Sequence, residues 1–271
     1  MPRVSTPKLL TLGNPKTAKG EGIGYLTAIL HLAPFDLSGR NVCPHASPGC
    51  VAGCLNTAGR GGIIRTGEST NAIQEARKAR TRFFFDSRSD FVEQLTHEVR
   101  LHVRRARKNG LAPAVRLNGT SDLRWERLAP ELFETFPDVR FYDYTKDPKR
   151  MIDSLPKARS AWPQNYALTF SRSEENENVC LDILNAGGQV AAVFDTRKGS
   201  EFPESWKGWR VVNGDAHDLR FLDPSGCVVG LRAKGKARKD ASGFVIATGR
   251  LSDEKKREAD DYIRKGLKHV R

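Results

Sequence analysis

Short apolar segments alternate with helical or loop segments through the second half of the chain, and this alternation limits the fold more than any other feature. Strands that alternate with helices pair in parallel, because right-handed crossovers return each strand beside the previous one. The sequence therefore predicts an α/β fold, a partial (β/α) barrel of about six to seven parallel strands, with an open doubly wound sheet as the alternative. The predicted strands of this half are 114–118, 139–145, 166–171, 190–195, 210–213 and 228–231.

The first half of the chain adds one strand and two helices. Residues 22–34 combine glycine, β-branched and aromatic residues, which predicts the first strand. The apolar residues of 67–86 recur every three or four positions, which is helical spacing, and 87–110 carries a similar apolar stripe that ends at a glycine. A further helix is predicted over 173–188, because its first turn is acidic and two glycines end it.

Three parts are expected along the chain: a loose polar arm (1–20), a single partial-barrel domain (21–240) and a charged helical extension (241–271). The arm has no long apolar run after its basic residues, so it does not read as a secretory signal. No stretch approaches the roughly 20 apolar residues of a membrane span. We therefore expect a cytoplasmic protein with no membrane partner.

The stretch CPHASPGCVAGC, here called the cysteine loop (residues 43–54), holds Cys43, Cys50 and Cys54 just after the first predicted strand. Thiols stay reduced in the cytoplasm, so clustered cysteines indicate metal or redox chemistry rather than disulfides. Soft thiolate ligands are typical of iron–sulfur clusters and of zinc. We favour a 4Fe-4S cluster, with zinc as the alternative and His45 as its candidate fourth ligand.

The other two cysteines carry weaker expectations. Cys180 stands between valine and leucine in a predicted helix, which is typical of a core position. Cys227 begins a late predicted strand, where burial is the favoured interpretation and a remote fourth metal ligand the alternative.

Polar clusters follow five of the predicted strands directly. They read RLNGTSD, YDYTKD, TFSRSE, VFDTRK and VVNGD. A polar turn explains any one of them, but the sites of α/β folds are built where parallel strands end. Five such clusters in succession, each with an amide, a carboxylate or a cation, predict a polar pocket at that edge of the sheet.

A cysteine loop after the first strand, followed by a partial barrel with polar strand ends, resembles the radical S-adenosylmethionine superfamily. A closer resemblance is to the phage gene product eighty-eight family, carried by FDLSGRNVCPHASPGCVAGCLNTAGRGG (35–62), VRLNGTSDL (115–123) and VRFYDYTKDPKR (139–150). The resemblance extends over residues 20–235. It implies a location in the host cytoplasm if the gene is phage-borne.

The superfamily resemblance also implies a mechanism. Cys43, Cys50 and Cys54 would bind three irons of a 4Fe-4S cluster, and the open iron would bind S-adenosylmethionine. A reductant such as flavodoxin would supply the electron for radical chemistry on a nucleotide or nucleic acid. The implied cofactor-binding residues are Asn118, Ser121, Asp122, Lys146 and Arg172, and the implied substrate-facing residues are Asp195 and Asn213.

The chain is strongly basic, with a formal net charge of +13, which favours polyanionic partners. The cations of 100–108 read as a solvated helix face. The stretch LRAKGKARKD (231–240) has little core material and reads as a phosphate-contacting loop. Its predicted nucleic-acid contacts are Lys234, Lys236, Arg238 and Lys239. The competing hypothesis is therefore a non-catalytic iron–sulfur (or zinc) protein that binds nucleic acid.

Overall fold

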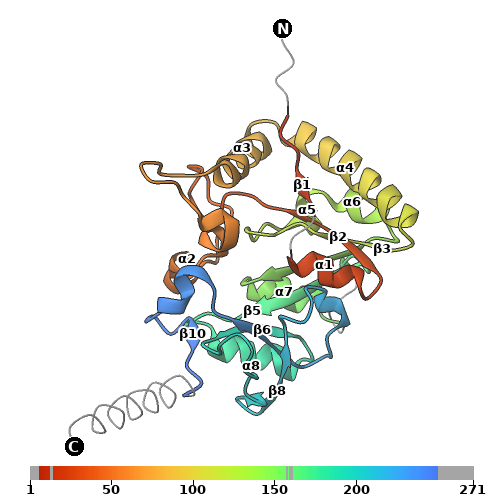
Figure 1. Ribbon diagram of the computed structural model, residues 1–271. Helices are drawn as coiled ribbons and strands as arrows, with labels where there is room; N and C mark the ends of the chain where they lie inside the picture. Colours follow the sequence, from red (N-terminus) through yellow and green to blue (C-terminus); the bar gives the residue numbers. More distant parts are fainter. Residues whose placement is uncertain (1–5, 13–14, 157, 159–160, 250–271) are drawn as a thin grey trace, which may run out of the picture.

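The computed structural model describes residues 6–12, 15–156, 158 and 161–249 of the chain (Figure 1). Its centre is a sheet of ten strands in the order β1-β2-β3-β4-β5-β6-β9-β8-β7, with β10 also paired to β6. The strands are β1 (Leu10–Thr11), β2 (Tyr25–Leu30), β3 (Ala112–Arg116), β4 (Arg140–Thr145), β5 (Tyr166–Ser171), β6 (Val190–Phe194), β7 (Ser205–Trp206), β8 (Trp209–Asn213), β9 (Val228–Arg232) and β10 (Val245–Ile246).

The sheet is mostly parallel. All neighbouring pairs from β2 to β8 along this order are parallel, and the antiparallel pairs lie at the two edges, where β1 meets β2 and β7 meets β8. The α/β class is confirmed, and so is the predicted run of parallel strands. The sheet is not closed, and the radical-SAM-like barrel remains a prediction.

From β2 to β6 the strands lie in the sheet in the same order as in the sequence, and after β6 they do not. After β6 the chain crosses to the edge, forms β7 and β8, and returns to insert β9 between β6 and β8. On the other side of β6, β5 pairs only with Val190 and Ala191, and β10 pairs with Val193 and Phe194. The C-terminal part of the described chain thereby reaches the carboxyl end of the sheet.

Helices connect these strands. They are α1 (Pro15–Glu21), α2 (Pro48–Ala52), α3 (Ala72–Asp86), α4 (Arg88–Lys108), α5 (Trp125–Leu128), α6 (Pro130–Thr135), α7 (Pro148–Ser154) and α8 (Glu177–Asn185). Asn71 caps α3 as its side chain accepts from two backbone N–H groups, which explains where the predicted 67–86 helix begins. The three predicted helices are confirmed with shorter ends.

The main core lies on one face of the sheet. Alternate strand residues such as Val115, Phe141 and Phe170 pack there with Phe91 and Leu95 of α4, because successive strand side chains point to opposite faces. The other face carries smaller clusters, including Ala114 and Tyr142 with Leu219. Cys180 and Cys227 are both buried, as the core interpretation predicts.

The structure describes part of each predicted terminal segment. The arm expected to be loose contains β1, paired through Leu10 and Leu30, and the helix α1. The predicted C-terminal extension is described only up to residue 249, where it contributes β10, and the rest of it lies outside the described residues. In the described part of the chain, no helix is long and apolar enough to span a membrane.

Candidate functional site

The cysteine loop lies between β2 and α3, at the edge where the parallel strands end. Cys50 stands within α2, and Cys54 precedes a 3-10 turn, η1 (Leu55–Thr57), which is followed by a second turn, η2 (Gly59–Gly62). Figure 1 shows α2 next to the C-terminal segment that leads to β10. No disulfide involves the described cysteines, since all five are free thiols.

The three thiols of the loop lie within electrostatic reach of one another. Burial raises the pKa of Cys43 to about 12, and the neighbouring Cys54 and Cys50 add to this rise. Burial also raises the pKa of Cys54, with a further rise from Cys50. Thiols with raised pKa values are protonated near neutral pH, and a bound metal would displace those protons.

Backbone amides point at two of the sulfurs. The Phe35 N–H donates to Cys43 Sγ at 3.4 Å, and the Asn56 N–H donates to Cys54 Sγ at 3.5 Å. Hydrogen bonds to sulfur stabilise thiolates and tune the potential of iron–sulfur clusters. This feature suits a thiolate-bound inorganic group of either kind.

A carboxylate at the end of β5 holds α2 against the sheet. Glu174 Oε1 accepts from the Gly49 N–H at 2.6 Å, and Glu174 Oε2 accepts from Ser47 Oγ at 2.8 Å. Ser47 Oγ in turn accepts from the Cys50 N–H at 3.2 Å, as the cap of α2. Gly49 has no room for a side chain, because a Cβ there would lie 2.6 Å from Phe244 Cβ.

An arginine of α3 holds the other end of the loop. Arg77 Nη1 donates to Asn56 Oδ1 at 2.5 Å, next to Cys54. The position of Cys54 is therefore fixed from α3, and that of Cys50 from β5. Sequence reasoning missed both Arg77 and Glu174. Glu174 stands in the polar cluster TFSRSE, but Arg77 has no local signal that separates it from the other cations of its helix.

Zinc and a 4Fe-4S cluster require different arrangements of their ligands. A zinc ion gathers about four ligands at 2.0–2.3 Å. In the part of the chain that the structure describes, no three His, Cys, Asp or Glu side chains form a group that could hold a metal ion. His45, the candidate fourth ligand, has its Nε2 3.6 Å from Asp147 Oδ2. A 4Fe-4S cluster binds each thiolate through a separate iron, so its ligands stand further apart. The choice between a 4Fe-4S cluster and zinc stays a prediction.

The predicted residues after β3 form hydrogen bonds within their own loop and to residues that follow β4. Asn118 is 2% exposed, and its Oδ1 accepts from Ser121 Oγ at 2.8 Å and from the Leu123 N–H at 2.9 Å. Asp122 accepts from the Lys146 N–H at 2.8 Å and from Arg150 Nη1 at 3.1 Å. These bonds tie the β3 loop to the β4 loop, and a cofactor role for Asn118, Ser121 and Asp122 stays a prediction.

Lys146 is one of two predicted residues that lie near the cysteines; the other, Asp122, adds to the rise in the pKa of Cys43. Lys146 Nζ donates to Ser171 Oγ at 3.0 Å and lies 5.6 Å from the centre of the Phe244 ring. Lys146 lies close enough to Cys54 to lower the pKa of that thiol, against the larger effect of burial. Its ammonium group is therefore available to offset negative charge at the loop.

Arg172 and Asp195 bind the C-terminal segment, and Asn213 binds the turn that follows β8. Arg172 Nη1 donates to the Phe244 carbonyl at 2.9 Å, which holds the C-terminal segment onto β5. Asp195 accepts from the Thr248 N–H at 2.9 Å, and Asn213 Oδ1 accepts from the Asp215 N–H at 3.0 Å. The structure thus assigns these three side chains to packing of strand ends, and their substrate or cofactor roles stay predictions.

The basic C-terminal stretch lies against the cysteine loop. It forms a 3-10 turn, η5 (Gly235–Lys239), and a Cβ added at Gly53 would lie 3.1 Å from Ala237 Cβ. Lys234 pairs with Asp215 at 2.9 Å. The other three predicted nucleic-acid contacts, Lys236, Arg238 and Lys239, are exposed. Two separate sequence features, the thiols and these cations, therefore lie side by side.

The comparisons with known proteins agree with the closer of the two resemblances. The family model described as Gene product 88 matches residues 8–248. No curated protein and no solved structure showed a significant match to the chain. The matched range contains the whole cysteine loop, the sheet and η5, and the chain therefore belongs to the Gene product 88 family.

Proposed function

We propose that the protein binds a 4Fe-4S cluster through Cys43, Cys50 and Cys54 and uses it in radical-type chemistry on a nucleotide or nucleic acid. The observation that carries the proposal is the loop itself. Three free thiols lie within electrostatic reach of one another, at the carboxyl edge of a parallel sheet. Two of the sulfurs accept backbone N–H bonds. This is where α/β folds place their sites.

Three protein ligands leave one iron of a four-iron cluster open to a small molecule such as S-adenosylmethionine, and the bound cluster supplies one-electron chemistry. The chain's own residues shape the surroundings. Glu174 and Arg77 fix the two ends of the loop. Arg77 and Lys146 lie close enough to Cys54 to lower the pKa of its thiol, and they would balance the charge of thiolate ligands.

The C-terminal segment would shield the site from water. Phe244 packs against Gly49 and over the Lys146 ammonium, and Arg172 holds the Phe244 backbone in place. A polyanionic substrate is supported by the net charge of +13 and by the exposed cations of η5 beside the loop. The electron would come from an external reductant such as flavodoxin.

The test of this chemistry uses the full chain, reconstituted anaerobically with iron and sulfide and then reduced. We expect S-adenosylmethionine to be cleaved to 5′-deoxyadenosine and methionine, as measured by chromatography. Lys146→Gln should slow cleavage, and Lys108→Gln, which removes an exposed lysine in the last turn of α4, should not. A protein that binds the cluster and leaves S-adenosylmethionine intact would overturn the radical part of the proposal.

A second candidate function is favoured by one specific observation. Asn118, Asp122 and Arg172, which the resemblance implies as cofactor contacts, all bind other parts of the chain. We therefore also propose a non-catalytic iron–sulfur (or zinc) protein that binds nucleic acid through η5. This alternative expects binding to single-stranded or duplex DNA that weakens steeply with salt, and no cleavage of S-adenosylmethionine. DNA binding that is insensitive to salt would contradict it.

A further inference from the structure

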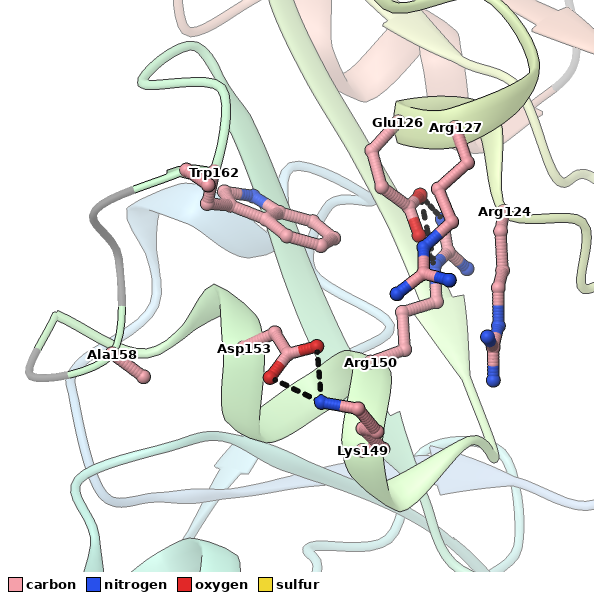
Figure 2. A pocket seen from close by; sticks show the side chains of 9 residues that line it. Arg124, Glu126, Arg127, Lys149, Arg150, Asp153, Ala158 and Trp162 are labelled. Carbon is pink, nitrogen blue, oxygen red and sulfur yellow. Dashed lines mark hydrogen bonds and ion pairs between the residues drawn. The ribbon is translucent and has the colours of Figure 1, made fainter.

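A cavity of about 310 Å³ lies beside α5 and α7, and we call it the basic cavity (Figure 2). Two carboxylates outside the lining, Asp122 and Asp147, pair with Arg150 and Arg124, and four cations and two carboxylates form the lining itself. These charged side chains are Arg124, Glu126, Arg127, Lys149, Arg150 and Asp153, and Trp162 lies across from them. Neither the cysteines nor the cations of η5 belong to this lining.

The inner wall of the basic cavity is a buried ion cluster. The Arg150 side chain is 1% exposed, and its Nη2 donates to Glu126 Oε2 at 2.9 Å while its Nη1 donates to Asp122 Oδ1 at 3.1 Å. Its Nη2 also donates to the Tyr166 hydroxyl at 2.5 Å. Arg150 is thus shared by Glu126 and Asp122, and the positive charge available to an anion comes from the cations at the mouth of the cavity.

Two cations at the mouth of the basic cavity, Arg127 and Lys149, are accessible to a ligand. Arg127 is exposed, and no ion-pair partner for it occurs among the residues that the structure describes. Figure 2 shows its guanidinium group pointing into the cavity. Lys149 pairs with Asp153 at 3.1 Å, but its side chain is 70% exposed. An exposed pair of this kind contributes little, so the ammonium can turn to a ligand.

Opposite the cations, Trp162 is held as a fixed aromatic wall. Its ring stacks on Tyr166 with centroids 5.4 Å apart, and its Nε1–H donates to the Tyr166 carbonyl at 2.7 Å. Only 7% of the residue is exposed, so the indole does not reorient freely. Aromatic rings of this kind stack on nucleobases, and cations bind phosphate groups.

We infer that the basic cavity binds a nucleoside monophosphate, with the phosphate on Arg127 and Lys149 and the base against Trp162. Its volume lies at the lower end of the range of small-molecule sites, which suits a mononucleotide better than a dinucleotide. The site does not depend on the cysteines or on a cluster. Its ligand binding is measured on the protein without iron, so its failure and that of the proposed function are distinguishable.

The test is calorimetric titration of the full chain with AMP, ribose 5-phosphate and adenosine. We expect AMP to bind more tightly than either fragment. Arg127→Gln should weaken AMP binding at least about tenfold, and adding Lys149→Gln should weaken it further. The matched control is Arg107→Gln, an exposed arginine of α4 that pairs with Asp138.

Each of the following outcomes would contradict the inference or one part of it. Equal losses in Arg127→Gln and Arg107→Gln would show a general effect of charge and no site. Ribose 5-phosphate that binds as tightly as AMP would remove the base contact, and adenosine that does so would remove the phosphate contact. No heat of binding with AMP at millimolar concentration would overturn the inference. Arg127 has no partner in the described structure, so its variant is expected to fold.

Discussion

Charged side chains serve different purposes in the cysteine loop and in the basic cavity. In the loop, Glu174 and Arg77 bind the backbone and an amide side chain, and thereby fix the segment that carries the thiols. In the cavity, only the inner wall is fixed in this way, by Arg150, while Arg127 and Lys149 are exposed at the mouth. The first region is organised to position its own sulfurs. The second leaves cations available to a ligand.

The wall of the cavity should give the largest effect on stability. Arg150→Leu leaves Glu126 and Asp122 without their buried partner, and we expect a loss of about 3–5 kcal/mol in the free energy of unfolding, because an uncompensated buried charge is costly. Urea denaturation measures it. Arg127→Leu, on the same cavity but without a partner in the described residues, should change stability by less than about 0.5 kcal/mol. Similar losses in both variants would contradict the distinction between wall and mouth.

The clamp of the cysteine loop should give the next largest effect. Glu174→Ala removes the acceptor for the Gly49 N–H and for Ser47 Oγ, and we expect a loss of about 1–3 kcal/mol. It should also lower iron uptake, since Cys50 follows these residues directly. Glu175→Ala is the matched control, because Glu175 is exposed. If both variants take up iron like the wild type, Glu174 does not position the thiols.

These two regions also show how far the sequence could predict the molecule. Local patterns sufficed for the strands and for the cysteine loop, because apolar runs, helical spacing and clustered thiols are properties of contiguous residues. They did not predict that β9 inserts between β6 and β8, or that η5 packs on the cysteine loop, since both depend on contacts between distant segments.

The polar strand ends illustrate the same limit at single residues. Asp122 follows β3, where a site carboxylate is expected, but it accepts from Lys146, just after β4, and from Arg150 of α7. A carboxylate that faces a ligand and one that holds a neighbouring loop have the same local sequence. The partner decides between them, and the partner is 24 or 28 residues away.

Acid should lower the free energy of unfolding through His31, which follows β2. Burial, helped by Arg77, Arg116 and Arg80, lowers the pKa of His31 from 6.5 to about 3, so the folded protein holds this imidazole neutral. The stability this contributes is fully present above pH 6.5 and is lost as the pH falls toward 3. The loss should reach up to about 1.4 kcal/mol per pH unit. His31→Gln, measured by thermal unfolding between pH 7 and 4, should lose less stability than the wild type; parallel curves would contradict this assignment.

The exposed pair at the cavity mouth should give the smallest effect. Asp153→Asn breaks only the surface pair with Lys149, and we expect a change of less than about 0.5 kcal/mol in the free energy of unfolding. The same change should strengthen AMP binding slightly, because Lys149 is released to the ligand. Weaker AMP binding in this variant would show that Lys149 is not a phosphate contact.

The most direct test of the central claim is the iron content of the anaerobically reconstituted chain. The account predicts about four irons and four sulfides per wild-type chain. It predicts loss of that iron in each of Cys43→Ala, Cys50→Ala and Cys54→Ala, and retention in Cys227→Ala, whose thiol is buried and lies outside the loop. A colourless wild-type protein, or equal iron loss in Cys227→Ala, would contradict it.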